Sequence, residues 1–152
     1  MHDYGKTRMS TPKPEHDLTV CVCNKTRIAA RVVTRIYDEA LRPARLRATQ
    51  FALLVALGMD GAMSIAALAK LMAMDRSTLT RNLRPLEVGG LVARGDEGWR
   101  RSKSVEITAN GRVRLRQGLP LWRSAQSEVL RKLGPSSWSR VHAGLELLAG
   151  IG

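Results

Sequence analysis

Acidic residues are scarce in this 152-residue chain. Thirteen Asp and Glu stand against twenty-five Lys and Arg, which gives a formal net charge of +12. A charge this lopsided decides little about the fold, but it favours a polyanionic partner, either nucleic acid or anionic lipid. On charge alone, a basic protein with no such partner remains an alternative.

Long hydrophobic runs and a secretory signal are also lacking. The longest apolar stretch, residues 51–59, falls well short of the roughly 20 residues that span a bilayer. Residues 1–17 are polar and contain two prolines, but no apolar segment of the kind that directs export. We therefore expect a cytoplasmic protein that does not enter a membrane.

Catalytic and metal-binding signatures are missing as well. The sequence contains no phosphate-binding loop, no dinucleotide glycine pattern, no HExxH motif and no nucleophile elbow. His2 and His16 fall in the polar N-terminal segment, and His142 lies near the C-terminus. Cys21 and Cys23 lack the further ligands that a zinc site needs, and in a reducing cytosol they are thiols rather than a disulfide. We expect no enzymatic activity, no metal and no cofactor.

Aromatic residues make up only 4% of the chain, which argues against the stacking platforms that bind single-stranded RNA. Two functions with nucleic acid remain open, a sequence-specific regulator of double-stranded DNA and a non-specific architectural protein. An architectural protein binds every duplex with the same dependence on salt, whereas a regulator must prefer one palindromic site.

The apolar residues recur mostly with the period of a helix. After a flexible arm at residues 1–17, a helix is expected from about residues 18–24 to residue 41, ending before Pro43. A second helix, about residues 48–58, is apolar nearly all round, which is typical of a helix in the middle of a domain. The apolar positions of the first helix recur every four residues, at Ile28, Val32 and Ile36.

Two short helices joined by a tight turn come next. Ser64 is expected to cap the first, and Asp75 a second that runs to about residue 88 and stops at two glycines. The second helix turns three leucines to one side and short hydroxyls and guanidiniums to the other, which is the pattern of a helix-turn-helix. The outer residues are Arg76, Ser77, Thr78, Thr80, Arg81 and Arg84.

The chemistry of this outer face suits duplex DNA. Hydroxyls bond base edges or phosphates, and an arginine can grip guanine with two hydrogen bonds. Each of these residues taken alone is equally well explained as a solvated helix position. Together, on one face after a capped turn, they favour DNA reading.

The period then changes to two, which predicts a β-hairpin. Residues 91–94 and 103–108 are interpreted as its strands, and the polar loop between them carries Arg100 and Arg101, which can enter a flanking minor groove. Between residues 76 and 116, ten basic residues and four acidic ones give a net charge of +6, half the excess of the whole chain. The predicted fold is therefore mainly α with a small β-hairpin wing, a winged helix-turn-helix.

The C-terminal segment has more apolar surface than one small domain can cover. A long helix is expected over residues 109–133, capped by Thr108 and kinked at Pro120, and a last helix over residues 136–151. Their apolar residues would be difficult to bury within one subunit, which predicts a homodimer. Two symmetric recognition helices about 34 Å apart demand a palindromic operator.

These segments resemble the MarR family of transcriptional regulators. The run DRSTLTRNL that begins at Asp75, with the Leu-Glu and Gly-Leu-Val that follow it, is similar to that family's recognition helix and next strand. Arg101 with VEITANG at residues 105–111 is similar to the second half of its wing signature. The resemblance covers about residues 18–150. It implies a dimer formed by the first and last helices, with one winged domain on each of two successive major grooves.

On this resemblance, residues 18–152 form a single MarR-like domain. The winged helix-turn-helix occupies about residues 48–108, and the dimerisation helices about residues 18–42 and 109–151. The resemblance also implies that the protein acts on transcription, more commonly as a repressor.

One residue of the wing departs from the family pattern. The family usually has an acidic residue two places before the arginine that corresponds to Arg101, and this chain has Trp99 there. That acidic residue helps to hold the arginine, and Asp96 or Glu97 can substitute for it.

The two cysteines suggest one way of releasing DNA. Cys21 and Cys23 begin the first helix, where the helix dipole favours the thiolate. Cys23 precedes Tyr37 by fourteen residues, a spacing similar to the peroxide-sensing branch of the MarR family, in which a tyrosine sets the reactivity of the sensor cysteine. Arg27 stands where that branch has another tyrosine. The alternative is that two small cysteines pack at the dimer interface.

A small aromatic ligand is the other way of releasing DNA that the resemblance implies. Such an anion would bind between the DNA-reading lobe and the dimer helices. Residue type alone suggests Arg31, Arg35, Tyr37 and Phe51 as its lining, and the two arginines are more often solvated helix positions. The sequence thus predicts a DNA-binding repressor released by a small aromatic ligand or by cysteine oxidation.

Overall fold

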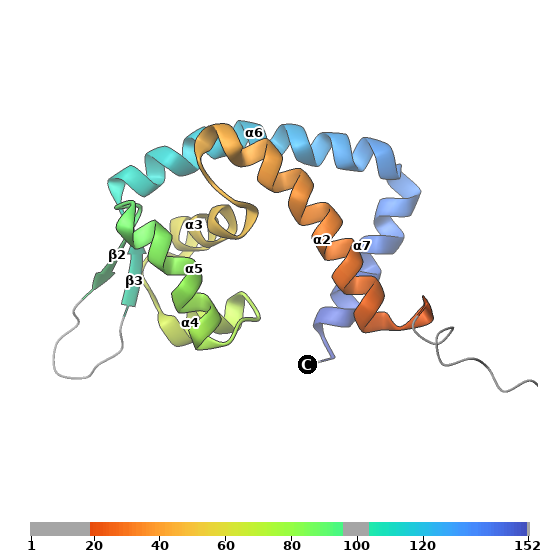
Figure 1. Cartoon of the computed structure of the whole chain (residues 1–152), viewed down its shortest axis with the longest axis horizontal. Helices are drawn as coiled ribbons and strands as arrows, with labels where there is room; N and C mark the ends of the chain where they lie inside the picture. Colours follow the sequence, from red (N-terminus) through yellow and green to blue (C-terminus); the bar gives the residue numbers. More distant parts are fainter. Residues whose placement is uncertain (1–18, 96–103, 152) are drawn as a thin grey trace, which may run out of the picture. The chain divides into compact units, whose positions relative to one another are not determined.

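The computed structural model describes residues 19–95 and 104–151, which are mostly helical with one small sheet (Figure 1). The chain divides into two compact units, one up to Arg35 and the other from Ile36 to Gly152. The elements are α2 (Val22–Leu41), a 3-10 turn (Arg42–Ala44), α3 (Ala48–Asp60), β1 (Met63–Ser64), α4 (Ile65–Leu71), α5 (Arg76–Val88), β2 (Val92–Gly95), β3 (Ser104–Ile107), α6 (Ala109–Leu133) and α7 (Pro135–Ala149). The predicted fold class, mainly α with a small β-hairpin, is confirmed.

The sheet has three antiparallel strands in the order β1-β3-β2. Val92 pairs with Ile107 and Gly95 with Ser104, which confirms the predicted hairpin. Met63 pairs with Val105 from the other side, adding a strand that the sequence did not predict. Two residues are too few to show the alternation by which a strand is recognised.

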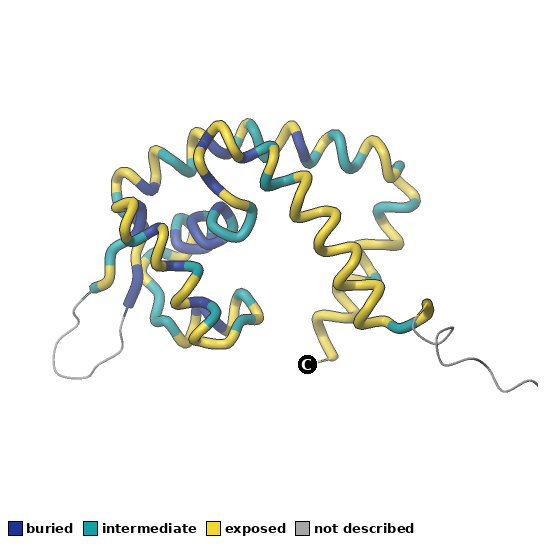
Figure 2. Tube along the Cα trace, in the orientation of Figure 1, coloured by how far each residue is buried: buried dark blue, intermediate teal, exposed yellow. Residues whose placement is uncertain are grey.

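Helix α3 lies at the centre of the hydrophobic core, as predicted for an all-round apolar helix. Figure 2 shows the buried residues concentrated on α3, on the inner side of α5 and on β3. The α3 residues Leu53, Leu54 and Leu57 are fully buried. Phe51 stacks against Trp122 of α6 with ring centroids 6.2 Å apart. The α5 leucines Leu79, Leu83 and Leu86 close the core.

All three predicted N-terminal caps are present. The side-chain oxygen of Ser64 accepts from the amide of Ala67 at 3.1 Å, and that of Thr108 from the amide of Gly111 at 3.0 Å. Asp75 accepts from the amide of Thr78 at 2.8 Å. Each cap satisfies an amide that has no partner within its own helix, so these local bonds fix where α4, α5 and α6 begin.

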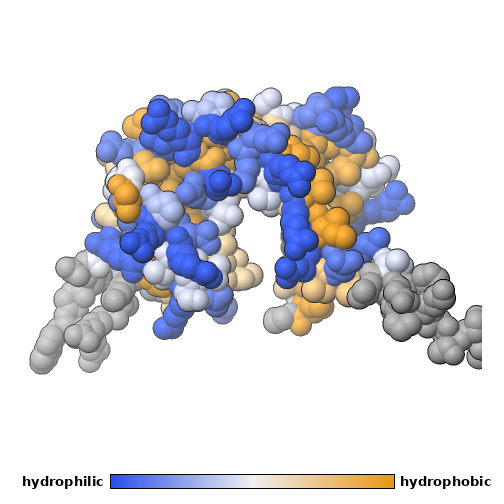
Figure 3. Space-filling view, in the orientation of Figure 1, coloured by the Kyte–Doolittle hydropathy of each residue, from blue (hydrophilic) through white to orange (hydrophobic). Residues whose placement is uncertain are grey.

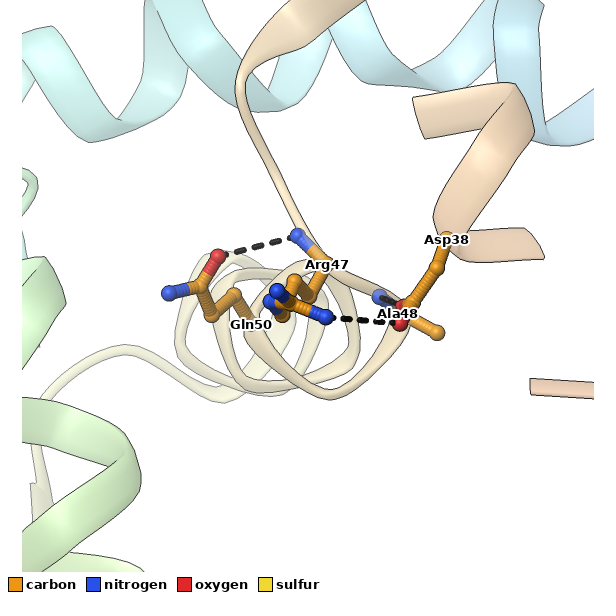
Figure 4. A network of polar contacts seen from close by, with 4 residues as sticks. All are labelled: Asp38, Arg47, Ala48 and Gln50. Atoms are coloured by element: carbon orange, nitrogen blue, oxygen red, sulfur yellow. Dashed lines mark hydrogen bonds and ion pairs between the residues drawn. The ribbon is translucent and has the colours of Figure 1, made fainter. Parts of the chain in front are cut away.

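Helix α3 begins differently, with a cap from a residue far along the chain (Figure 4). A carboxylate oxygen of Asp38, near the end of α2, accepts from the amide of Ala48 at 2.7 Å. The other oxygen pairs with the guanidinium of Arg47 at 3.2 Å. Gln50 in turn accepts from the amide of Arg47 at 2.9 Å. These bonds tie the C-terminal end of α2 to the first turn of the central helix.

Close contacts at two glycines set the position of α6. A Cβ on Gly111 would overlap the carbonyl oxygen of Leu91, and a Cβ on Gly118 would lie 3.0 Å from the ring of Phe51. Both glycines are buried, so α6 packs closely on α3 and on the base of the hairpin. The helix runs through Pro120 to Leu133 without ending there, and the predicted kink remains a prediction.

The terminal helices contain few buried residues. Among residues 19–35, every residue is exposed except the half-buried Cys21, and hydrophobic side chains lie at the surface along α2 (Figure 3). Helix α7 buries no residue at all. Its exposed large hydrophobic residues are Val141, Leu145, Leu147 and Leu148.

Candidate DNA interface

Helix α5 separates its residues into two faces, as the sequence predicted. Leu79 and Leu83 are fully buried and Leu86 is 1% exposed, which fixes the helix on the core. The opposite side is hydrophilic (Figure 3). It carries the predicted set, in which Thr78 is half-buried and the others are exposed: Arg76, Ser77, Thr80, Arg81 and Arg84.

A tight turn directs α5 away from α4. The amide of Met74 donates to the carbonyl of Ala69 at 2.9 Å, and Ala73 has a positive φ of 49°. The side-chain amide of Asn82 donates to the carbonyl of Thr78 at 3.0 Å and contacts the sulfur of Met74 at 3.9 Å. Asn82 therefore holds the turn against the first half of α5. No local pattern in the sequence marks this role of Asn82, because the role depends on how the turn folds back.

The first turn of α5 is organised around the carboxylate of Asp75. This group accepts from the hydroxyl of Ser77 at 2.6 Å, from the hydroxyl of Thr78 at 2.6 Å and from the amide of Thr78 at 2.8 Å. These hydrogen bonds, that of the Ser77 hydroxyl most of all, hold the pKa of Asp75 well below its usual range. Arg81 reaches back toward the Thr78 hydroxyl at 3.4 Å. Two hydroxyls of the predicted DNA-reading face, those of Ser77 and Thr78, are thus held in fixed positions.

The arginines of α5 are available for an anionic partner. Within residues 19–95 and 104–151, no carboxylate forms an ion pair with Arg76, Arg81 or Arg84. Arginine pairs readily with phosphate and with the acceptor edge of guanine, so an unpaired group of three suits DNA.

The base of the hairpin is fastened to the far end of α5. Arg94 of β2 pairs with Glu87 of α5 through Nε and Oε1 at 2.6 Å. The hydroxyl of Thr108 donates to the carbonyl of Gly90 at 2.7 Å, which joins the end of β3 to the turn after α5. The hairpin loop, with Arg100, Arg101 and Trp99, lies outside the described residues.

The candidate sensor residues lie near opposite ends of α2. Cys23 is exposed at the second position of the helix, Cys21 precedes it, and both are free thiols. Tyr37 lies in the last turn and a half, where its hydroxyl donates to the side chain of Gln126 on α6. Burial raises the pKa of Tyr37, so its hydroxyl stays protonated at neutral pH. The role of these residues as a sensor remains a prediction.

The residues suggested for an aromatic ligand have different surroundings. Arg31 and Arg35 are exposed on α2. Phe51 is 5% exposed and belongs to the core, where it contacts Trp122. Their role in a ligand pocket is untested.

Two further findings apply to the described part of the chain. It contains no cluster of three or more His, Cys, Asp or Glu side chains that could hold a metal ion. None of its helices is both long enough and apolar enough to cross a bilayer.

Comparisons with known proteins place the chain in a family. The model described as MarR family matches residues 46–97. The chain is similar to the M. tuberculosis transcriptional regulator MosR in complex with DNA, with 39% identity and a TM-score of 0.77 over 85% of this chain and 93% of that one. No curated protein gives a significant match.

More distant relatives share the fold. A mutant of E. coli MarR complexed with operator DNA has 22% identity and a TM-score of 0.75, over 84% of this chain and 92% of that one. Bordetella bronchiseptica BpsR has 24% identity and a TM-score of 0.76, over 87% and 95%. With the family model and MosR, these findings lead to one conclusion: the chain belongs to the MarR family of transcriptional regulators.

Proposed function

We propose that this MarR-family regulator acts as a homodimeric repressor that binds a palindromic operator in double-stranded DNA. The observation that carries the proposal is the outward face of α5, where three arginines that pair with no carboxylate of the described residues stand beside the ordered hydroxyls of Ser77 and Thr78. The N-terminal residues of a recognition helix contact base edges in the major groove. The related MosR was solved in complex with DNA.

The arginines of α5 are proposed to bind different parts of the DNA. Arg81 lies one turn into the helix and is proposed to bind guanine through its O6 and N7 atoms. Arg76 and Arg84, at the two ends of the exposed face, are proposed to contact phosphates, which fix register rather than sequence. Arg100 and Arg101 of the wing are proposed to bind the flanking minor groove.

Dimerisation is supported by the apolar residues of the terminal helices. Val32 of α2 is 53% exposed, and Leu145 and Leu147 of α7 are 48% and 74% exposed. Large exposed apolar residues in such number are characteristic of surfaces that bind another protein. A second copy that covers them would place two α5 helices on one palindrome.

Release from the operator is proposed to follow one of the two routes that the sequence suggested. Cys23 is an exposed thiol, which a hydroperoxide can reach and oxidise. The alternative is a small aromatic ligand, as for BpsR, whose DNA binding is regulated by 6-hydroxynicotinic acid. If oxidation is the signal, mild hydroperoxide releases the wild-type protein from DNA and leaves the Cys23→Ser variant bound. An equal response of both would exclude Cys23 as the sensor.

The function is tested by titrating the reduced protein against its own upstream DNA and a scrambled duplex at physiological salt. We expect a preference of at least about 1,000-fold for the upstream DNA, the lower end of the range for specific DNA-binding proteins. Arg81→Ala is expected to lose about tenfold or more in affinity for the upstream DNA only. Arg123→Ala, which changes an exposed arginine of α6, is the matched control and should bind as the wild type does.

A non-specific architectural protein remains the alternative. It would bind both duplexes equally and with the same steep dependence on salt. Sequence-specific affinity that depends on Arg81 would exclude it.

A further inference from the structure

The hydroxyl groups at the start of α5 have no proton left to offer to DNA. Ser77 and Thr78 each hold their hydroxyl 2.6 Å from a carboxylate oxygen of Asp75. The low pKa of Asp75 keeps this group ionised, and an ionised carboxylate only accepts hydrogen bonds. Each hydroxyl must therefore donate its single proton to Asp75. What remains on each oxygen is the capacity to accept.

This direction limits what the two side chains can bind on a duplex. Phosphate oxygens carry no proton, so a hydroxyl that can only accept forms no hydrogen bond with them. In the major groove, guanine N7 and O6 and thymine O4 are acceptors, and they offer no proton either. The donors there are the amino groups N6 of adenine and N4 of cytosine.

Of the two hydroxyls, that of Ser77 is the one free to bind a base. Thr78 is half-buried, and its hydroxyl oxygen faces the guanidinium of Arg81 at 3.4 Å. Ser77 is exposed at the second position of α5, among the residues that reach base edges in a helix-turn-helix.

Capping alone does not require a carboxylate at this place. Ser64 caps α4 and Thr108 caps α6 with neutral hydroxyls, and serine caps a helix about as well as aspartate does. A negative charge beside a polyanion lowers affinity for it. The capacity to accept from three donors at once is what Asp75 adds.

We propose that Asp75 determines specificity as a positioning residue, by orienting the Ser77 hydroxyl to accept a hydrogen bond from the amino group of adenine or cytosine in the major groove. The inference rests on the proposed function, because it assumes that α5 reads DNA. It adds the class of base that one position of each half-site must contain.

The test is a competition experiment on duplexes in which each base pair of the bound upstream site is varied in turn. The wild-type protein is expected to prefer adenine or cytosine at one pair of symmetry-related positions. Ser77→Ala is expected to reduce this preference about fivefold, the value of one hydrogen bond, and to change no other position. Its melting temperature should fall only slightly, because the hydrogen bond to Asp75 that is lost lies at the surface.

Two substitutions at Asp75 separate its charge from its hydrogen bonds. Asp75→Ser keeps the cap but leaves the Ser77 hydroxyl free to donate, so the preference at that position should fall as in Ser77→Ala. Asp75→Asn removes the charge but keeps one side-chain oxygen. That oxygen must face the Thr78 amide, which needs an acceptor, and in the wild type the same oxygen also accepts from the Ser77 hydroxyl. Asp75→Asn should therefore keep the preference and bind all duplexes somewhat more tightly.

Results that differ from these expectations would contradict either the role of Asp75 or the proposed function. Unchanged base preferences in Ser77→Ala, or a full preference in Asp75→Ser, would overturn the role of Asp75 while leaving the proposed function intact. A wild-type protein without any preference among duplexes would overturn the proposed function and this inference together.

Discussion

The segment proposed to read DNA and the terminal helices differ in how many of their apolar residues are buried. The first of these, residues 46–111 within the described part of the chain, has a core in which α3 and α5 bury leucines and β3 buries Val105 completely. Helix α7 buries nothing, and α2 buries only Leu41. The same chain thus contains a lobe with a buried apolar core and helices with uncovered apolar residues.

This difference separates what one chain can stabilise from what requires a partner. Burial of apolar surface is the main favourable contribution to folding, and the lobe obtains it from residues of this one chain, including Leu41 and Trp122 outside the lobe. The apolar side chains of α7 obtain it only when another surface covers them. We therefore expect mutations in the lobe to act on folding and mutations in α7 to act on assembly.

The largest effect on stability is expected in the core of the lobe. Leu83→Ala removes a fully buried side chain and should lower the free energy of unfolding by about 2–5 kcal/mol. Urea denaturation measures it. Met59→Ala, at a position 80% exposed, is the control and should change stability by less than about 0.5 kcal/mol. Equal losses would contradict the contrast in burial.

The next effect concerns assembly. Leu145→Glu places a charge among the exposed apolar residues of α7 and should convert the proposed dimer to monomers, seen by light scattering. Affinity for the operator should fall about 100-fold or more, because the two half-sites are no longer bound together. Met59→Glu makes the same change outside the terminal helices. If both variants keep the mass of the wild type, α7 is not the interface.

A smaller effect is expected where the hairpin is fastened to α5. Glu87→Gln breaks the 2.6 Å ion pair between Glu87 and Arg94. The side chain of Glu87 is 27% exposed and that of Arg94 33% exposed. The expected loss of stability is at most about 1 kcal/mol, because such pairs are largely solvated. Glu128→Gln, which breaks a more exposed pair with Arg131 on α6, should cost less. The reverse order, measured by urea denaturation, would show that the Arg94 pair does not hold the hairpin.

The smallest effect is a dependence on pH at Asp75. The pKa of Asp75 is lower in the folded chain than its ordinary value of 3.8. The ionised carboxylate therefore adds its full stability to the folded state at pH values above 3.8, and this stability is lost as the pH falls below 3.8. The difference in unfolding free energy between the wild type and Asp75→Asn should be constant from about pH 5 to 7 and narrow below about pH 4. A difference that widens in acid would contradict the ionised carboxylate.

The elements that the sequence predicted well are those set by neighbouring residues. The caps at Ser64, Asp75 and Thr108 each bond an amide three residues ahead, so composition and spacing reveal them. The two faces of α5 follow from the period of a helix.

What the sequence did not reveal depends on distant residues. The cap of α3 comes from Asp38, ten residues before Ala48, and Tyr37 bonds Gln126 across 89 positions. No local pattern marks such pairs, because folding alone brings them together. The direction of the hydroxyl bonds at Ser77 and Thr78 is likewise visible only once their distances to Asp75 are known.

The most direct measurement is the affinity of the reduced wild-type protein and of Arg81→Ala for the upstream DNA and for a scrambled duplex, each over a range of salt concentrations. The account predicts a large preference for the upstream DNA in the wild type, and a loss in Arg81→Ala confined to that DNA. Equal binding of both duplexes by the wild type, or equal losses on both in Arg81→Ala, would contradict sequence reading by α5.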